Sequence, residues 1–209
     1  MLERIVFQLA GQRSDYPQSR GLSYCLPTIW NRKNLISLLQ AAASLRTRYP
    51  RLLLVLYGRA AITPERETAF ESRARELGLD GAFERTGALD DRVLRQLYQQ
   101  CTLFVFPSLY EGFGLPLLEA MACSACVVAR SASAMAEVVG DAGTLVETRD
   151  PDVLADSIRK LLDNPLKCEE LRTAALHRAR LFTIDRMAGL TYRSYCTALD
   201  IKNDDAPLP

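Results

Sequence analysis

Short apolar runs alternate with longer amphipathic runs along most of this chain, and this alternation restricts its possible folds more than any other feature. The runs typical of strands cover residues 22–29, 51–58, 81–87, 102–108, 125–131 and 142–147. The runs typical of helices cover residues 34–49, 63–79, 89–100, 115–123, 150–164, 165–182 and 183–200. Strands that alternate with helices predict βαβ units and right-handed crossovers. The predicted fold class is therefore α/β, with a parallel sheet flanked by helices.

Several of the predicted helices begin with residues that favour a helix start. Pro64 and Pro151 occupy first-turn positions, where the missing N–H costs no helical hydrogen bond. Asp90 and Asp150 precede helices, where a carboxylate can accept from the free N–H groups of the first turn. Residues 1–21 precede the first predicted strand and are interpreted as an N-terminal segment or linker remnant, and residues 200–209 as a loose tail.

Length and charge exclude several classes of protein. A chain of 209 residues suits one domain with a sizeable core, here predicted over residues 22–199. The 26 Lys and Arg residues nearly balance 25 Asp and Glu residues, so bulk charge does not indicate a nucleic-acid partner. No apolar run approaches the roughly 20 residues that span a bilayer, and the N-terminus lacks the apolar segment of a signal peptide. A cytoplasmic location is expected.

The cysteines and the histidine give little indication of a metal or redox centre. The six cysteines are scattered, mostly within apolar runs, which is typical of buried, reduced thiols. Cys123 and Cys126 have redox spacing, but no second pair or nearby histidine supports a zinc site. His177, the only histidine, falls in a charged helical run and is interpreted as a surface residue. Neither a metal nor a cofactor is expected.

The turn Glu111-Gly112-Phe113-Gly114 separates the strand-like run 102–108 from the helix-like run 115–123. Ligands of parallel sheets bind at the carboxyl ends of the strands, which is where this turn lies. Glycines let the backbone approach a ligand, and a helix N-terminus favours phosphate. Glu111 and Glu119 can accept hydrogen bonds from vicinal sugar or ribose hydroxyls. From the turn alone, an equally good interpretation is that neither glutamate binds a ligand, with Glu111 a solvated loop residue and Glu119 a surface residue of the helix.

The segment "SLYEGFGLPLLEAMAC" resembles the donor-site signature of retaining glycosyltransferases of family 4, in which seven residues separate two glutamates as they do here. The likeness extends to "NRKNLISLLQAAASLRTRYPRLLLVLYG", "FERTGALDDRVLRQLYQQCTLFVFPS" and the segment from "AEVVGDAG" onward, and covers roughly residues 22 to 199. It implies a Rossmann-like domain that forms one half of a two-domain glycosyltransferase architecture. That half is the C-terminal one, which holds the nucleotide-sugar donor.

The resemblance also implies roles for individual residues. Glu119 would accept hydrogen bonds from the ribose of the nucleotide, and Glu111 would contact hydroxyls of the transferred sugar. The backbone of Gly112, Phe113, Gly114 and Leu115 would approach the sugar and the diphosphate.

A basic pair, Arg32 and Lys33, matches the family's cations that neutralise the donor diphosphate. Cations placed there stabilise the negative charge left on the phosphate when the sugar departs. Thr28 stands where the family often has arginine and is counted among the donor-binding residues. Pro27 stands where the family usually has glycine, and proline fixes φ and cannot donate an N–H. The catalytic set expected from the resemblance is Glu111, Lys33 and Arg32.

The first functional hypothesis is the donor-binding half of a retaining hexosyltransferase, which would use a nucleotide diphosphate sugar as substrate. Mannose from GDP-mannose and a surface polysaccharide or glycan product are the candidates that the resemblance suggests. The acceptor-binding half, in the same chain or another, would be its partner, and the isolated chain is expected to be inactive. Contact with a membrane surface would come through that half.

Two alternatives stay open. A transferase-like binding or interaction module without turnover is favoured by Pro27 and by the missing half. A sugar-nucleotide epimerase shares the two-domain architecture, but the missing half counts against it.

Overall fold

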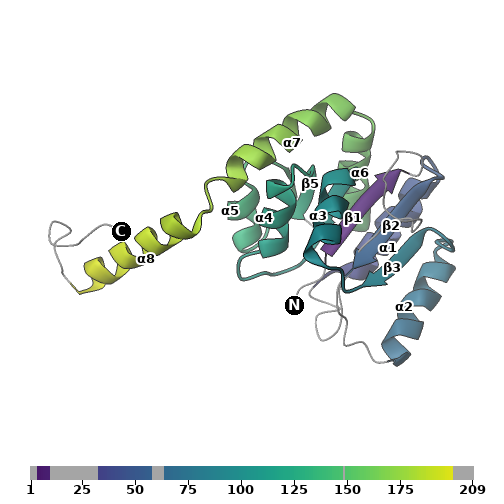
Figure 1. Ribbon diagram of the computed structural model, residues 1–209. Coiled ribbons are helices and arrows are strands. Elements are labelled where there is room, and N and C mark those ends of the chain that lie inside the picture. Colours follow the sequence, from purple (N-terminus) through teal and green to yellow (C-terminus); the bar gives the residue numbers. More distant parts are fainter. Residues whose placement is uncertain (1–3, 10–32, 58–63, 148, 200–209) are drawn as a thin grey trace.

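The structure is a computed structural model and describes residues 4–9, 33–57, 64–147 and 149–199. Within these residues, six strands form one sheet with the order β3-β2-β1-β4-β5-β6. The strands are β1 (Arg4–Leu9), β2 (Leu52–Tyr57), β3 (Phe83–Gly87), β4 (Leu103–Phe106), β5 (Val127–Arg130) and β6 (Thr144–Val146). Two groups of helices flank this sheet (Figure 1). The α/β fold class is therefore confirmed.

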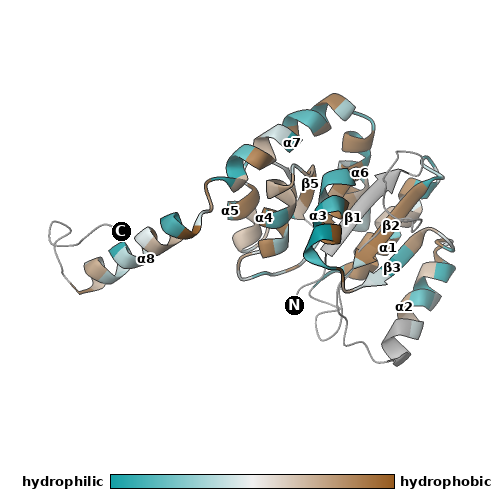
Figure 2. Cartoon of the chain, viewed as in Figure 1, coloured by the Kyte–Doolittle hydropathy of each residue, from teal (hydrophilic) through white to brown (hydrophobic). Residues whose placement is uncertain are grey.

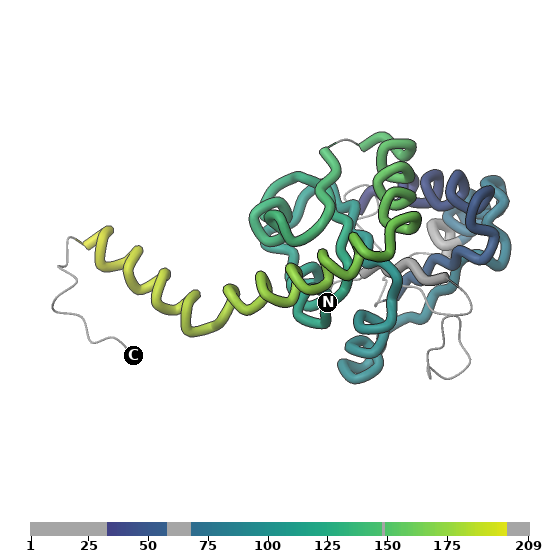
Figure 3. Tube along the Cα trace, turned by 90° about the horizontal axis from the view of Figure 1, so that it is seen from above, coloured from purple at the N-terminus to yellow at the C-terminus, as the bar shows by residue number. Residues whose placement is uncertain are grey.

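Three helices alternate along the chain with β2, β3 and β4: α1 (Leu35–Arg46), α2 (Pro64–Glu76) and α3 (Asp91–Gln100). The others are α4 (Leu115–Ala122), α5 (Ala134–Val139), α6 (Pro151–Leu162), α7 (Pro165–Ala179) and α8 (Ile184–Ala198). α1 packs against α6, while α4 packs against α5 and α7. α8 extends away from the rest of the domain (Figures 1 and 3).

All strands except β1 run in the same direction. β2 pairs in parallel with β3, and β5 pairs in parallel with β4 and β6. β1 lies antiparallel between β2 and β4, with Arg4 opposite Tyr57 and Val6 opposite Phe104. The sequence did not predict β1, because its apolar run is short and interrupted by Gln8. Its pairing with distant strands leaves no local signal.

The interior consists of apolar strands covered on both sides. Every residue of β2 and β4 is buried, as expected for strands that are packed on both faces. Figure 2 shows β2 as a hydrophobic strand within the domain. Phe104 and Phe106 in β4 are among the largest fully buried side chains, and their rings stack with centroids 6.0 Å apart. This apolar layer supports the turn that follows β4.

The helix-start predictions are confirmed where the structure describes them. Asp90 accepts from the Val93 N–H at 2.9 Å, and Asp150 accepts from the Asp152 N–H at 2.8 Å. α2 begins at Pro64 and α6 at Pro151. The sequence missed α5, a short helix of six residues. The predicted strand over residues 22–29 and the predicted loose tail over residues 200–209 lie outside the described residues, and the division of the chain into domains stays a prediction.

Candidate functional site

The glutamate-containing turn connects β4 to α4, so the predicted strand, turn and helix are all present. Gly114 is the N-cap of α4 and has φ of 90°, in the left-handed region that favours glycine. A side-chain Cβ at Gly112 would meet no atom within 4 Å, so this glycine lies beside open space. Gly112 therefore leaves the backbone of the turn accessible at the carboxyl end of β4, whereas Gly114 is buried.

Lys33 and Glu111 form a buried ion pair at the base of this turn. Their exposed fractions are 2% and 4%, and the ammonium Nζ donates to Glu111 Oε1. The same Nζ lies 4.5 Å from the centre of the Phe106 ring, a favourable position for a cation. Charges removed from water require such partners, since isolated burial is very costly. The structure thus brings together two of the three residues expected to be catalytic.

The turn is also held by the segment that follows β5. The Glu111 N–H donates to Ser133 Oγ at 3.0 Å, and Arg130 Nη1 donates to the Leu109 carbonyl at 3.2 Å. Ser133 has a φ of 51°, uncommon for a residue with a side chain, and is the N-cap of α5. Sequence reasoning missed Ser133 and Arg130. Arg130 lies at the carboxyl end of a parallel strand, the position that could have indicated its role.

Glu119, half-buried in α4, is the last member of a chain of hydrogen bonds. Tyr98 in α3 donates its hydroxyl to Glu119 Oε2 at 3.1 Å, and the Tyr57 hydroxyl at the end of β2 donates to the Tyr98 oxygen at 2.8 Å. Tyr57 and Tyr98 are 3% and 2% exposed. No signal in the sequence linked these tyrosines to Glu119, because three separate elements carry the three residues.

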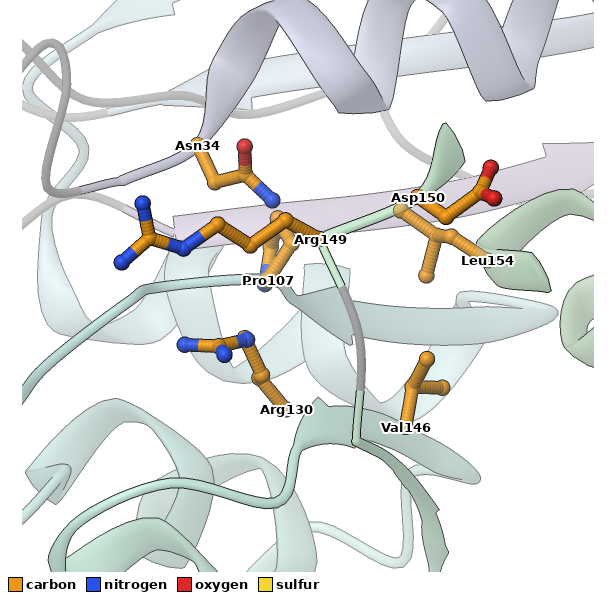
Figure 4. A pocket seen from close by; sticks show the side chains of 7 residues that line it. All are labelled: Asn34, Pro107, Arg130, Val146, Arg149, Asp150 and Leu154. Carbon is orange, nitrogen blue, oxygen red and sulfur yellow. The ribbon is translucent and has the colours of Figure 1, made fainter. Parts of the chain in front are cut away.

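Two arginines lie at the carboxyl ends of the strands, in a small pocket beside the start of α1 (Figure 4). The pocket is lined by Asn34, Pro107, Arg130, Val146, Arg149, Asp150 and Leu154. The guanidinium groups of Arg130 and Arg149 extend to the same side of this pocket in Figure 4. Arg130 Nε is buried and makes no hydrogen bond. Two cations on one side of a pocket favour an anionic ligand, and the sequence had not indicated this pair.

The remaining predicted site residues fall into two groups. Phe113 and Leu115 are on the surface of the turn, 42% and 53% exposed, and the Phe113 ring contacts Phe182 with centroids 6.0 Å apart. Arg32 and Thr28, like Pro27, lie outside the described residues. The roles expected for all these residues stay predictions.

The other sequence interpretations concern thiols, metals and membranes. His177 is exposed, as expected for a surface residue. Of the cysteines that the structure describes, each is buried except the half-buried Cys123. Within the described ranges, no group of three or more His, Cys, Asp or Glu side chains could hold a metal ion. None of the described helices is long and apolar enough to cross a bilayer.

The sheet and its flanking helices match solved glycosyltransferases of the GT-B fold. Anabaena HepE, solved in complex with UDP, matches with a TM-score of 0.71 at 23% identity, over 84% of this chain and 48% of HepE. The C-terminal domain of the group 1 glycosyl transferase LpcC from Francisella tularensis matches with a TM-score of 0.62 at 26% identity, over 72% of this chain and 79% of that domain.

The family model "Glycosyl transferases group 1" matches residues 13–178, and the chain therefore belongs to this family. It is 33% identical over 180 residues to O-antigen chain mannosyltransferase B of Escherichia coli, across 84% of this chain and 46% of the relative. It is 35% identical over 172 residues to the MMP alpha-(1->4)-mannosyltransferase of Mycolicibacterium hassiacum, across 80% of this chain and 40% of the relative. The chain thus spans less than half the length of these two relatives.

Proposed function

We propose that this chain is the C-terminal, donor-binding domain of a retaining glycosyltransferase of family 4, acting on a nucleotide diphosphate sugar. The arrangement that carries the proposal is the buried Lys33–Glu111 pair at the base of a glycine turn, with Glu119 in the helix α4 that begins directly after this turn. Carboxylates that accept from hydroxyls, an accessible backbone and nearby cations are together the groups that a sugar diphosphate requires.

Each group has a part in the proposed chemistry. The nucleotide ribose donates to Glu119, and the transferred hexose donates to Glu111 and approaches the backbone from Gly112 to Leu115. The bond from the anomeric carbon to the phosphate oxygen breaks, and the oxygen of an acceptor hydroxyl bonds to the same carbon with retention of configuration. The proton of that hydroxyl passes to the departing nucleoside diphosphate. Lys33, with Arg32, stabilises the negative charge that the leaving diphosphate acquires.

Arg130 and Arg149 strengthen the positive potential at the same edge of the sheet. Arg130 ends β5 and Arg149 follows β6, and Arg130 donates to the carbonyl of Leu109, two residues before Glu111. Guanidinium groups suit phosphate oxygens because they present several donors in one plane. We therefore include this pair among the groups that attract the diphosphate.

The likeness to mannosyltransferases favours mannose, carried by GDP, and a product that is a surface polysaccharide or another glycan. Because these relatives are longer than this chain, the acceptor would be bound by a second, N-terminal half. The isolated chain would then bind donor without transferring sugar. Its location would be cytoplasmic, and it would need no further cofactor.

A thermal-shift screen of the 209-residue chain with UDP-, GDP- and ADP-sugars at millimolar concentration tests the proposal. A ligand that binds the native state raises the melting temperature by an amount set by its concentration relative to Kd. A shift with one nucleotide class supports a donor site and identifies the nucleotide. The absence of a shift with all three would reject donor binding.

The second candidate is an interaction module without turnover. Apolar side chains are exposed around the same turn: Tyr110 is 61%, Phe113 42% and Leu115 53% exposed. Such side chains at the mouth of a site can serve a protein partner as well as a sugar. This candidate predicts no thermal shift with any nucleotide sugar.

A further inference from the structure

We propose that Tyr98, supported by Tyr57, is a positioning residue that fixes the carboxylate of Glu119 for the ribose of a nucleotide. The inference rests on the proposed function and deepens it, because it explains how a glutamate on a short helix could keep one orientation. It is carried by the hydrogen bonds from Tyr57 to Tyr98 and from Tyr98 to Glu119.

The direction of this hydrogen-bond chain follows from the chemistry of its members. An ionised carboxylate can only accept hydrogen bonds, so the hydroxyl hydrogen of Tyr98 is directed at Glu119 Oε2. The oxygen of Tyr98 then accepts from Tyr57, which commits the hydrogen of Tyr57 as well. Hydrogen bonds that follow one another in this way polarise and strengthen one another, most of all where water is excluded.

Packing holds the donor in place. The ring of Tyr98 meets the rings of Tyr57 and Phe104 edge to face, with centroids 6.2 and 5.4 Å apart and interplanar angles of 81° and 85°. A ring fixed on two sides places its hydroxyl at one point, and that hydroxyl restricts rotation of the Glu119 carboxylate. A flexible glutamate would have to lose this freedom when it binds a ligand, at a cost in affinity.

The location of the chain is consistent with a ribose contact. Tyr57 ends β2 at the carboxyl edge of the sheet, and Glu119 lies in the helix that follows the glycine turn. Tyr98, in α3, connects the two. The carboxylate is thus supported from the interior, while the half-buried state of Glu119 leaves part of its side chain accessible to a ligand.

The test compares Tyr98→Phe and Tyr57→Phe with the unchanged chain by calorimetric titration of UDP and GDP and of their 2′,3′-dideoxy counterparts. The nucleotide with the higher affinity is then used throughout. Tyr98→Phe should lower the affinity for the ribonucleotide about three- to tenfold, as expected for one lost hydrogen bond to a charged group. It should lower the affinity for the dideoxy analogue much less. Tyr57→Phe should act in the same direction with a smaller effect.

Two comparisons separate positioning from a loss of stability. In a Glu119→Gln background, Tyr98→Phe should cause no further loss of affinity, because its effect passes through the carboxylate. Tyr49→Phe is the matched control, because it removes the phenol bond to Asp163 between the end of α1 and the end of α6. This control should leave the ratio of ribonucleotide to dideoxynucleotide affinity unchanged.

The outcomes distinguish the two proposals. If the unchanged chain binds ribonucleotide but Tyr98→Phe has the same ribose preference, the positioning role is wrong and the donor site stands. If Tyr98→Phe weakens both ligands equally, its effect is structural and the positioning role is again wrong. If the unchanged chain binds no nucleotide, both the proposed function and this inference are rejected.

Discussion

Lys33 and Glu111 are 78 positions apart in the chain, yet the ammonium of one donates to the carboxylate of the other inside the protein. Lys33 comes just before α1, and Glu111 lies in the turn after β4, so the pair connects two loops at the carboxyl edge of the sheet. Neither side chain is more than 5% exposed. The cation that we propose for the phosphate and the carboxylate that we propose for a sugar hydroxyl thus lie in direct contact.

Removing either member of this pair should destabilise the fold. Lys33→Met leaves the Glu111 carboxylate without its cation, and Glu111→Gln leaves the ammonium without its carboxylate. Breaking a buried ion pair in this way costs about 3–5 kcal/mol. Urea unfolding followed by circular dichroism should show this loss for each variant.

The combined variant Lys33→Met, Glu111→Leu should recover much of that loss, because no uncompensated charge remains. The surface pair of Arg73 and Glu76 supplies the control. Its side chains are 40% and 61% exposed, so Glu76→Gln should leave the free energy of unfolding nearly unchanged. If Lys33→Met were as mild as Glu76→Gln, the Lys33–Glu111 pair would not contribute to the folded state in the way described.

The sequence predicted the outline of this arrangement and not its contacts. The hydrophobic periodicity and the helix-start signals located α1, α4 and the strand β4 that precedes α4, because these features depend on neighbouring residues. The same signals placed Glu111 in a turn. They could not show that its carboxylate is buried against Lys33, since that contact depends on how distant loops meet.

Features missed by the sequence analysis have a common cause. β1 depends on pairing with strands about 50 and 100 residues further along the chain. The hydrogen bonds from Tyr57 through Tyr98 to Glu119 join three elements. Arg130 and Arg149 come together in one pocket because β5 and β6 are adjacent strands. Arginine alone is uninformative in a sequence with 26 basic residues. Two arginines that line one pocket are the basis for the anion site that we propose.

The two glutamates of the turn should have separable effects on donor binding. Glu119→Ala should abolish the thermal shift caused by a nucleoside diphosphate, because the ribose loses its acceptor. Glu111→Ala should retain that shift and lose mainly the extra shift caused by the attached sugar. The measurement is the difference in melting temperature between nucleotide and nucleotide sugar for each variant, and equal losses in both would contradict this division of roles.

Alanine substitution of the two glycines of the turn should have different effects on the stability of the fold. Gly114→Ala places a side chain at φ of 90°, and we expect it to cost about 1–2 kcal/mol of stability. Gly112 does not have a positive φ, and a methyl group on its Cα would meet no atom within 4 Å, so Gly112→Ala should fold as well as the unchanged chain. If the turn backbone approaches the sugar, Gly112→Ala should still weaken donor binding, which calorimetry can measure. Equal stability losses for the two variants would refute the conformational argument.

Burial raises the pKa of the Cys101 thiol to about 12. An unfolded cysteine ionises near pH 8.5, so the unfolded chain releases this proton at lower pH than the folded chain. The stabilising contribution is therefore complete below about pH 8.5 and is lost as pH rises toward 12. Between pH 8 and pH 10, the free energy of unfolding measured with urea should decline less for Cys101→Ala than for the unchanged chain. The difference should be up to about 1.4 kcal/mol per pH unit. The same decline in both proteins would show that Cys101 does not retain its proton in the folded state.

Arg130 and Arg149 should contribute to binding through charge rather than shape. Arg130→Gln and Arg149→Gln should each lower the affinity for a nucleoside diphosphate about three- to tenfold, because each removes a cation from the edge of the pocket. The uncharged nucleoside should bind these variants as it binds the unchanged chain. Raising the salt concentration should reduce the difference, since ions screen charges that are partly exposed to water. Arg48→Gln, which removes an exposed guanidinium paired with Asp163, is the control and should change neither affinity. An equal loss for the nucleoside and its diphosphate would show that the two arginines support the fold and not the anion.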